Sequence, residues 1–534
     1  MPASNPHQNP NPAVDNHDPD SDQDLLAEDD AEEILSDAGD ADGDVAMDSD
    51  NDDDGEDYNN DNEEILLQND SIAYFDGHKD SIFAIAQHPL HPQLVATGGS
   101  EGEADDAPGK GYVSDTSSAV SQQPVLPPSY SSDPNAGARK ENVALNTLFE
   151  IDGHTDSINA LTFTLPRGDF LVSGGMDGRV RVYAVGIPPS GDASQARFKF
   201  VAESQETEEI NWLLPCPSPE YPNTVALGAS DGSVWVLTID LKDKASPIRI
   251  VQSYFLHLGP CTAGAWSPDG QLLATVSDAS SLHVFDVWGA AAAKSLVTDN
   301  GQTVVSLTEV DQRFAVEGGL YSVAFAPTGA FLAVGGYGGA IRIVGLPRLS
   351  GGAVTQIPLP AQVRGGVRRG APAVAAEPSS QAGAILAAIN VQSDGIESLS
   401  FSPAPQTLLA AGSVDGSIAV FDTARSFAVR KHIREAHDGE SVVKVEFVRS
   451  ASQPGMAGWL LTSCGLDGVV RRWDLRGATA SQNVSASAAV GLLKEWRGHR
   501  GGGAGGGILG FVQGETGEKV VTAGDDALAL VFEA

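Results

Sequence analysis

A repeated alternation of apolar and polar residues runs through positions 71–534. Each copy starts with an apolar run that ends in small residues, passes through a turn that is Asp-Gly in the best copies, and continues as an alternating strand. These best copies are DFLVSGGMDGRVRVYAV at 169–185, NTVALGASDGSVWVLTID at 223–240, QTLLAAGSVDGSIAVFDT at 406–423 and WLLTSCGLDGVVRRWDL at 459–475. Asp-Gly between alternating runs is a strong hairpin signal, because glycine accepts a positive φ and aspartate tolerates it. Four weaker copies bring the number of predicted hairpins to eight.

A further strand-like run precedes most hairpins, such as SINALTF at 157–163, and a more variable run follows them. Four strands in each repeated unit are typical of the blades of a β-propeller. We therefore predict an all-β fold with eight four-stranded blades. The last unit lacks its outer strand, and SIAYF at 71–75 stands where it could supply one. Pairing the two ends of the array in this way would remove exposed sheet edges.

Long stretches rich in Ala, Gly, Pro, Ser and Gln separate some of the predicted strands. They cover about 101–110, 117–142, 288–313 and 348–394. In a propeller such stretches are expected to leave the ring as loop insertions. The predicted propeller domain is thus 71–534, with four low-complexity insertions.

Charge divides the chain into two parts. Residues 1–70 contain 25 Asp or Glu and no Lys or Arg, and the rest of the chain carries −15 of the total net charge of −40. Residues 1–70 hold too few apolar side chains to offset the entropy of ordering, so we predict a disordered acidic tail. The negative charge argues against direct binding to nucleic acid or to an anionic membrane, and it favours a basic partner.

Short marks inside the units resemble those of WD-repeat propellers. Gly-His precedes the first strand at 77–78, 153–154 and 498–499, and Trp-Asp ends a third strand at 473–474. With its acidic tail and EEINWLLPCPS at 208–218, the chain resembles the family of angio-associated migratory cell protein and its fungal counterpart, a ribosome-assembly chaperone. The resemblance implies a non-enzymatic chaperone that holds the basic N-terminal segment of a large-subunit ribosomal protein on an acidic face. The alternative is a general scaffold for signalling or cell migration.

The WD-repeat resemblance also implies a buried hydrogen-bond relay in each blade, made of a His, the turn Asp, a strand Ser or Thr, and a Trp. The matching residues include His154, Ser173, Asp177, Tyr183, Asp467, Trp473, His499, Thr522 and Asp526. A Ser, a His and an Asp could also be read as a catalytic triad. However, the set recurs once per unit, as a scaffold does, and no GxSxG accompanies it, so we predict no enzyme.

Acidic residues precede the first strand in six of the predicted units. Propellers usually bind proteins on the face that carries these loops, which is an implication of the resemblance. Equivalent positions should meet on one rim if the ring closes, and converging carboxylates would attract a Lys/Arg-rich segment. A solvated rim without a partner is the alternative for any single residue. The predicted binding residues are Asp80, Asp156, Glu208, Glu209, Glu317, Asp394, Glu397, Asp438 and Glu440.

No pattern in the chain is typical of a metal or cofactor site. The eleven histidines are scattered without HExxH, and the three cysteines lie far apart without CxxC, so we expect no metal and no cofactor. The cysteines also fit a reducing compartment. We expect a monomer in the cytoplasm, with the nucleus as a second location.

Overall fold

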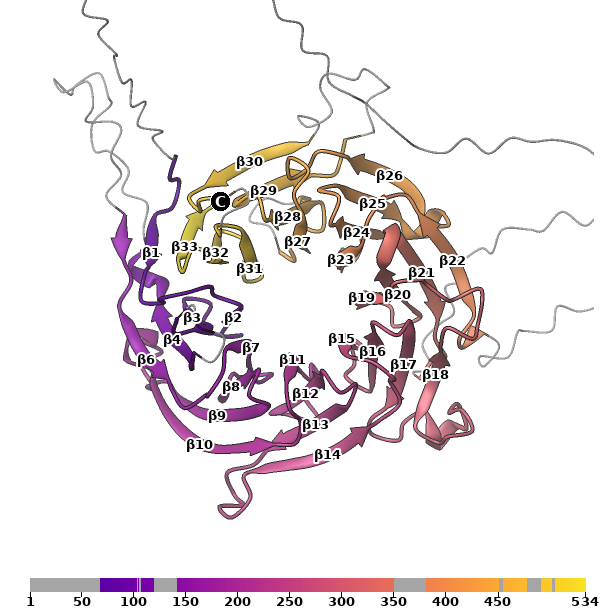
Figure 1. Cartoon of the computed structure of the whole chain (residues 1–534), viewed down its shortest axis with the longest axis horizontal. Coiled ribbons are helices and arrows are strands. Elements are labelled where there is room, and N and C mark those ends of the chain that lie inside the picture. Colours follow the sequence, from indigo (N-terminus) through magenta and orange to yellow (C-terminus); the bar gives the residue numbers. More distant parts are fainter. Residues whose placement is uncertain are drawn as a thin grey trace, which may run out of the picture. The chain divides into compact units, whose positions relative to one another are not determined.

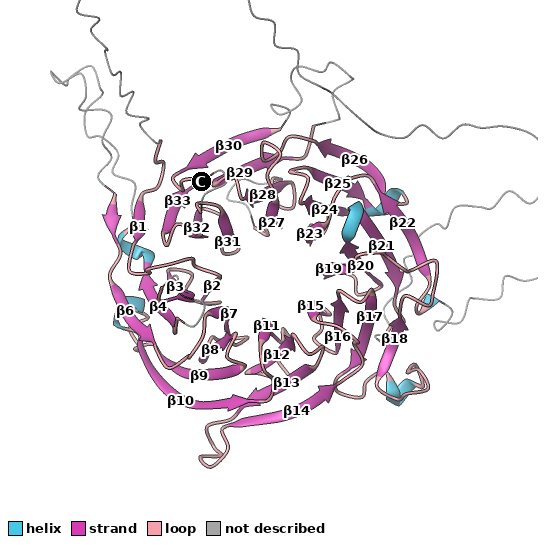
Figure 2. Ribbon diagram, viewed as in Figure 1, coloured by secondary structure: helices cyan, strands magenta, loops and turns pink. Residues whose placement is uncertain are grey.

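The computed structural model describes residues 68–102, 104, 107–119, 142–349, 381–450, 455–477, 491–501 and 505–534. Nearly all of the predicted acidic tail, 1–67, lies outside these residues, as do 120–141 and 350–380. Strands joined by turns make up most of the described chain (Figure 2). No helix in this part is long and apolar enough to cross a bilayer. The short 3-10 helices are η1 (Thr116–Ser118), η3 (Ala193–Gln195), η4 (Ala292–Lys294), η5 (Tyr337–Gly339) and η7 (Thr423–Arg425).

Eight sheets surround a central opening, which confirms the predicted propeller of eight four-stranded blades (Figure 1). The first strand of each blade lies innermost. From blade 1 to blade 8 the first strands are β2 (Ala84–Gln87), β7 (Ile158–Phe163), β11 (Ile210–Pro215), β15 (Cys261–Trp266), β19 (Leu320–Phe325), β23 (Ile396–Phe401), β27 (Val442–Phe447) and β31 (Ile508–Val512).

The other strands follow outward in the same blade order. The second strands are β3 (Leu94–Ser100), β8 (Phe170–Gly175), β12 (Thr224–Ala229), β16 (Leu272–Ser277), β20 (Phe331–Gly336), β24 (Leu408–Ser413), β28 (Leu460–Gly465) and β32 (Lys519–Gly524). The third strands are β4 (Gly109–Asp115), β9 (Arg179–Gly186), β13 (Val234–Ile239), β17 (Ser281–Asp286), β21 (Ala340–Gly345), β25 (Ile418–Asp422), β29 (Val469–Asp474) and β33 (Ala529–Glu533). The fourth strands are β6 (Thr147–Ile151), β10 (Arg197–Gln205), β14 (Ile248–Tyr254), β18 (Thr303–Leu307), β22 (Ile385–Asn390), β26 (Ala428–Ile433), β30 (Leu492–Arg497) and, in blade 8, β1 (Ala73–Phe75).

The turn between the second and third strands explains why Asp-Gly in the sequence predicted the positions of the blades. In blade 2, Gly178 has a φ of 70°, and Asp177 Oδ1 accepts the backbone N–H of Arg179 at 3.0 Å. Weaker copies lack this glycine but keep its conformation, since Ser280 in blade 4 and Ala527 in blade 8 have φ values of 53° and 62°. The hairpin therefore forms even in blades whose turn lacks the Asp-Gly sequence.

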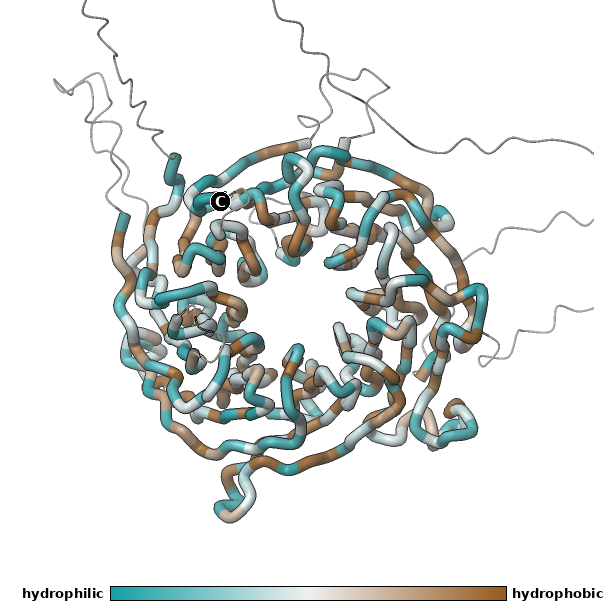
Figure 3. Tube along the Cα trace, viewed as in Figure 1, coloured by the Kyte–Doolittle hydropathy of each residue, from teal (hydrophilic) through white to brown (hydrophobic). Residues whose placement is uncertain are grey.

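Apolar side chains pack between neighbouring blades. Ile210 and Leu213 of blade 3, for example, lie in one buried cluster with Val172 and Val180 of blade 2. The second strand of a blade is sandwiched between two others in its sheet and between two blades, and β8 is buried along its whole length. Figure 3 shows hydrophobic segments recurring in every part of the ring. Blade-to-blade packing thus holds the ring and its central opening in place.

The predicted closure of the ring by residues 71–75 is confirmed. β1 pairs antiparallel with β33, with Ala73 opposite Val531, and it also carries the two-residue strand β5 (Val143–Ala144) on its other edge. Asp70, assigned above to the tail, extends this clasp: its N–H donates to the carbonyl of Arg497 in blade 7 at 2.7 Å. We call residues 68–75 the clasp.

Two of the predicted loop insertions contain strands. The segment 288–313 holds η4 and β18, so the expectation that it leaves the ring as a loop is wrong for its central part. The segment 348–394 contains β22. Both are the fourth strands of their blades, and each is a short apolar run inside a long stretch rich in Ala, Gly and Ser, so the pattern did not stand out. Most of 117–142 lies outside the described residues.

Candidate protein-binding site

Two loops meet at one end of each blade. In seven blades a backbone hydrogen bond joins these two loops, at 2.9 to 3.3 Å. Its donor is the N–H of the residue before the turn aspartate, or before the residue that replaces this aspartate. Its acceptor is the carbonyl of the residue just before the first strand. Met176 bonds Ser157 in this way, and Leu466 bonds Ser441. The loop before the first strand and the hairpin turn therefore lie side by side in these blades. We call the side of the ring that carries both the loop face.

Two equivalent positions on the loop face carry acids. One is the residue two places before the buried residue that opens the first strand, or before buried Ile82, which is its equivalent in blade 1. The other is the first residue of the hairpin turn. Seven of the eight blades have an acid at one of these positions, and we call this set the acidic ring. Its members are Asp80, Asp156, Glu208, Asp278, Asp394, Glu440 and Asp525.

Sequence reasoning missed Asp278 and Asp525, which occupy the second position. In these blades the first position is glycine, and in blade 4 this makes room for the acid: a Cβ on Gly259 would lie 2.3 Å from Asp278 Oδ1. Asp525 accepts the hydroxyl of Ser81 in blade 1. Aligning the units on their turns, rather than on their first strands, would have revealed both acids.

The carboxylates of the ring are held locally but carry no paired cation. Asp80, Asp156 and Asp394 each accept the backbone N–H of the following residue, at 2.7, 2.6 and 2.7 Å. Among the ion pairs within the described residues, none involves a member of the acidic ring. Their negative charge is thus left to act on a ligand.

The other four predicted binding residues have different surroundings. Glu209 is exposed beside Glu208, and Glu317 is exposed in the loop before β19. Glu397 lies one residue inside β23, at the opening itself. Asp438 differs from the members of the acidic ring in that a cation is paired with it, because Arg471 Nη2 lies 2.9 Å from its exposed carboxylate.

Blades 4 to 6 bring aromatic and acidic side chains together. Tyr321 donates its hydroxyl to the carbonyl of Gly318 at 2.5 Å. Burial raises the pKa of Tyr321, and the carboxylate of Glu397 raises it further. Burial likewise raises the pKa of Glu397, with Asp394 as the second cause. Tyrosine faces among uncompensated carboxylates suit a Lys or Arg side chain.

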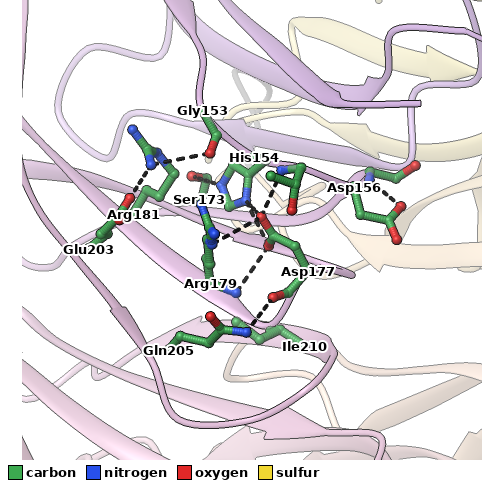
Figure 4. A network of polar contacts seen from close by, with 12 residues as sticks. Gly153, His154, Asp156, Ser173, Asp177, Arg179, Arg181, Glu203, Gln205 and Ile210 are labelled. Atoms are coloured by element: carbon green, nitrogen blue, oxygen red, sulfur yellow. Dashed lines mark hydrogen bonds and ion pairs between the residues drawn. The ribbon is translucent and has the colours of Figure 1, made fainter. Parts of the chain in front are cut away.

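The predicted relay residues lie behind the loop face. In blade 2, His154 Nδ1 lies 3.0 Å from Asp177 Oδ1, and its Nε2 lies 2.8 Å from the hydroxyl of Ser173 (Figure 4). Tyr183, in the place of Trp, donates its hydroxyl to the carbonyl of Asp152 at 3.2 Å. Ser173 is fully buried. A substrate could not reach it, so the set stabilises the blade rather than forming a catalytic triad.

Blades 8 and 7 repeat this arrangement. In blade 8, His499 lies 2.9 Å from Asp526 and 2.7 Å from Thr522. In blade 7, the indole of Trp473 donates to Ser463 at 2.9 Å.

His437 completes the relay of blade 7 and was missed because Ala, not Gly, precedes it. His437 contacts Asp467 at 2.9 Å and Ser463 at 2.8 Å. Arg471 also binds Asp467 there. Within the described residues, no group of His, Cys, Asp and Glu is arranged to hold a metal ion.

Other blades carry relay residues that the Gly-His mark did not reveal. His257 in blade 4 contacts Thr275 at 2.8 Å and Ser281 at 2.6 Å. In blade 6, Gln392 replaces the histidine and donates to Ser417 at 3.0 Å. Both residues stand four places before the buried residue that opens the first strand, and this spacing is the signal that could have found them.

Comparison with known proteins agrees with this architecture. The family model described as "WD domain, G-beta repeat" matches residues 145–184, 249–286, 312–344 and 384–422. Human angio-associated migratory cell protein is 24% identical over 388 residues, which cover 72% of this chain and 69% of that protein.

One further relative is a ribosome assembly protein, and another is known from a crystal structure. The Saccharomyces cerevisiae ribosome assembly protein SQT1 is 26% identical over 504 residues, covering 92% of this chain and 93% of that protein. The crystal structure of Chaetomium thermophilum Sqt1 bound to the N-terminus of the ribosomal protein L10 is 65% identical, with a TM-score of 0.73, and covers 88% of this chain and 100% of that one. The chain therefore belongs to the Sqt1 family of WD-repeat propellers.

Proposed function

We propose that this protein is a non-catalytic chaperone that holds the basic N-terminal segment of the large-subunit ribosomal protein L10 during ribosome assembly. The observation that carries the proposal is the acidic ring, whose seven carboxylates have no cationic partner among the described residues. It is supported by the 65% identical Sqt1, which is bound to the N-terminus of L10. A chain of net charge −40 can shield a basic client from unwanted contacts with RNA.

Binding of this kind depends on charge and should therefore weaken as salt rises. Converging carboxylates raise the rate at which a basic segment is captured more than they slow its release. Ribosomal RNA is a denser polyanion than the ring and would compete for the same cations. The proposed cycle is capture of the free client and its transfer to the RNA, with no chemical step.

Co-purification at low salt, followed by mass spectrometry, tests the identity of the client. Enrichment of L10 over other ribosomal proteins is the expected result. Recovery of kinases or receptors without any ribosomal protein would contradict the proposal and favour the signalling scaffold.

Charge reversal tests the place of binding. Glu209→Lys combined with Glu397→Lys should weaken binding of an L10 N-terminal peptide at least tenfold while leaving thermal melting unchanged. The matched control is Glu220→Lys combined with Glu515→Lys, because both residues are exposed and lie in loops at the opposite ends of the strands. Equal affinity of the two double variants would remove the loop face from the proposal.

We also propose that the protein acts as a monomer in the cytoplasm, with the nucleus as a second location. Sedimentation of the purified chain and imaging of a tagged copy test the two statements separately.

A further inference from the structure

In seven of the eight blades, the innermost strand contains one irregular residue. A register shift interrupts the pairing of the first strand with the second in seven blades, directly after the first residue of the strand. Such a bulge leaves one residue outside the ladder and re-aims its side chain. The bulge residues are Asn159, Asn211, Thr262, Tyr321, Glu397, Val443 and Leu509, and Phe83 stands at the equivalent place in blade 1.

Blades 2 to 4 use this position to join neighbouring blades. Asn159 donates to the carbonyl of Ile210 in the next blade at 2.5 Å, Asn211 to that of Cys261 at 3.0 Å, and Thr262 to that of Leu320 at 2.6 Å. The polar residues on this side of the opening therefore have a structural role.

Blades 7, 8 and 1 are different, because their bulge positions hold Val443, Leu509 and Phe83, which have no side-chain donor. Leu466 adds to them from the hairpin turn of blade 7, at the position that carries an acid in blades 4 and 8. Leu466 reaches the loop of blade 8, since a Cβ on Gly507 would lie 2.7 Å from its Cδ2. We call these four residues the apolar arc.

Two members of the apolar arc are open to solvent. Phe83 is 43% exposed and Leu466 is 36% exposed. Val443 and Leu509 are partly buried, and Val443 packs against the core between blades 7 and 8. Exposed apolar side chains that lie close together are typical of a contact surface. Three acids of the ring belong to the same blades: Glu440 in blade 7, Asp525 in blade 8 and Asp80 in blade 1. A ligand that carries both apolar and cationic side chains would therefore suit this sector.

We propose that the apolar arc receives an aliphatic or aromatic side chain of the same basic segment whose cations bind the acidic ring. This inference rests on the proposed function and adds a second specificity element to it. The ring attracts any polycation, because charge attraction acts at a distance. Burial of an apolar side chain needs direct contact, so the arc would separate the true client from other basic chains.

The two contributions respond differently to salt. Ionic screening weakens the attraction to the ring, whereas burial on the arc is hardly affected by moderate salt. A client with its apolar anchor should keep measurable affinity at a salt concentration that releases a purely cationic peptide.

The test compares two peptides on the full-length wild-type protein by fluorescence anisotropy. One is the L10 N-terminal peptide, and the other is the same peptide with its aromatic and large aliphatic residues replaced by serine, at unchanged charge. We expect the serine peptide to bind about tenfold more weakly, as for the loss of one partly buried side chain. Equal affinity of the two peptides would overturn the inference. Failure of both to bind would instead contradict the proposed function.

A protein variant locates the contact. Leu466→Ser should weaken the natural peptide about tenfold, leave the serine peptide unchanged and keep the slope of affinity against salt. Leu90→Ser is the matched control, because Leu90 is 59% exposed in the loop between β2 and β3, away from the loop face. If the two variants bind the natural peptide equally, the apolar arc is not the contact.

Discussion

Asp156 and Asp177 belong to the same blade, yet they are used in opposite ways (Figure 4). Asp177 is 3% exposed and accepts hydrogen bonds from His154 and from the backbone of Thr155 and Arg179. Burial would raise its pKa, but these bonds outweigh burial and hold the pKa below its usual value. Asp156 is partly exposed, and within the described residues its carboxylate accepts only the N–H of Ser157. The first aspartate stabilises the blade, and the second leaves its charge to a ligand.

The contrast extends to the whole ring. Carboxylates that hold the blades together are buried and share several donors, whereas carboxylates of the acidic ring lie at the surface with few. Stability and binding should therefore respond to different substitutions, even within one blade.

Removal of the clasp should have the largest effect on stability. A chain that begins at Gly77 loses Ile72 and Phe75, which are 7% and 5% exposed, along with the pairing to β33. Burial of two large side chains alone is worth about 3–6 kcal/mol, so thermal melting should fall sharply and peptide binding should be lost with it. A chain that begins at Gln68 keeps the clasp and should melt as the full chain does. Unchanged melting of the shorter chain would show that the clasp is dispensable.

Asp467→Ala should be the most damaging single substitution on the stabilising side. It removes the partner of buried His437 and one of the carboxylates around Arg471. Breaking a buried charge network costs about 3 kcal/mol or more, which denaturant unfolding would measure. Glu440→Ala, in the acidic ring of the same blade, should leave stability within about 0.5 kcal/mol. If both variants lose stability equally, the proposed separation does not hold.

The two acids that sequence reasoning missed give a smaller effect, and it falls on binding. Asp278→Asn combined with Asp525→Asn removes two charges from the ring and retains hydrogen-bond acceptors. Exposed charge pairs are worth about 0.2–1 kcal/mol each, so the loss of two should lower affinity for the L10 peptide about twofold to thirtyfold at low salt, with a shallower dependence on salt. Melting should not change. Glu220→Gln combined with Glu515→Gln controls for net charge.

The smallest expected effect is a change in how peptide binding depends on pH. The raised pKa of Glu397 means that it takes up a proton at a higher pH than an ordinary glutamate. A bound cation favours the charged carboxylate, so its contribution is present above that pKa and lost as pH falls through it. Glu397→Gln should bind the peptide about threefold more weakly at neutral pH and should show less loss of affinity at the start of acidification. Parallel pH profiles of variant and wild type would contradict this role.

The fold could be predicted from the sequence because hairpin turns repeat. Asp177-Gly178 and Asp415-Gly416 mark their blades by backbone chemistry alone. Blade 5 has Gly338 in place of the aspartate and still forms, since Gly339 supplies the positive φ of 74°. The outer strand β18 was not predicted, because its short apolar run lies inside a long stretch rich in Ala, Gly and Ser.

The candidate site was only partly predictable. The acids that precede a first strand occupy one position when the units are aligned, so Asp80, Asp156 and Glu440 could be predicted. Asp278 comes from a turn and joins the ring through the hydrogen bond that ties the two loops together. The pairing of Asp438 with Arg471 depends on a side chain of the third strand. Such a contact could not be predicted from residue spacing in the sequence.

The clasp also orders events during translation. Of the described strands, β1 leaves the ribosome first and β33 last, yet they are neighbours in blade 8. N-terminal segments fold first when they can do so alone, but β1 has no complete sheet to join until the final blade has been made. A prematurely terminated chain would keep an open gap between blades 7 and 1, and it would lack the Asp525 carboxylate of the acidic ring. Closure would thus restrict the proposed client capture to molecules in which blade 8 is complete.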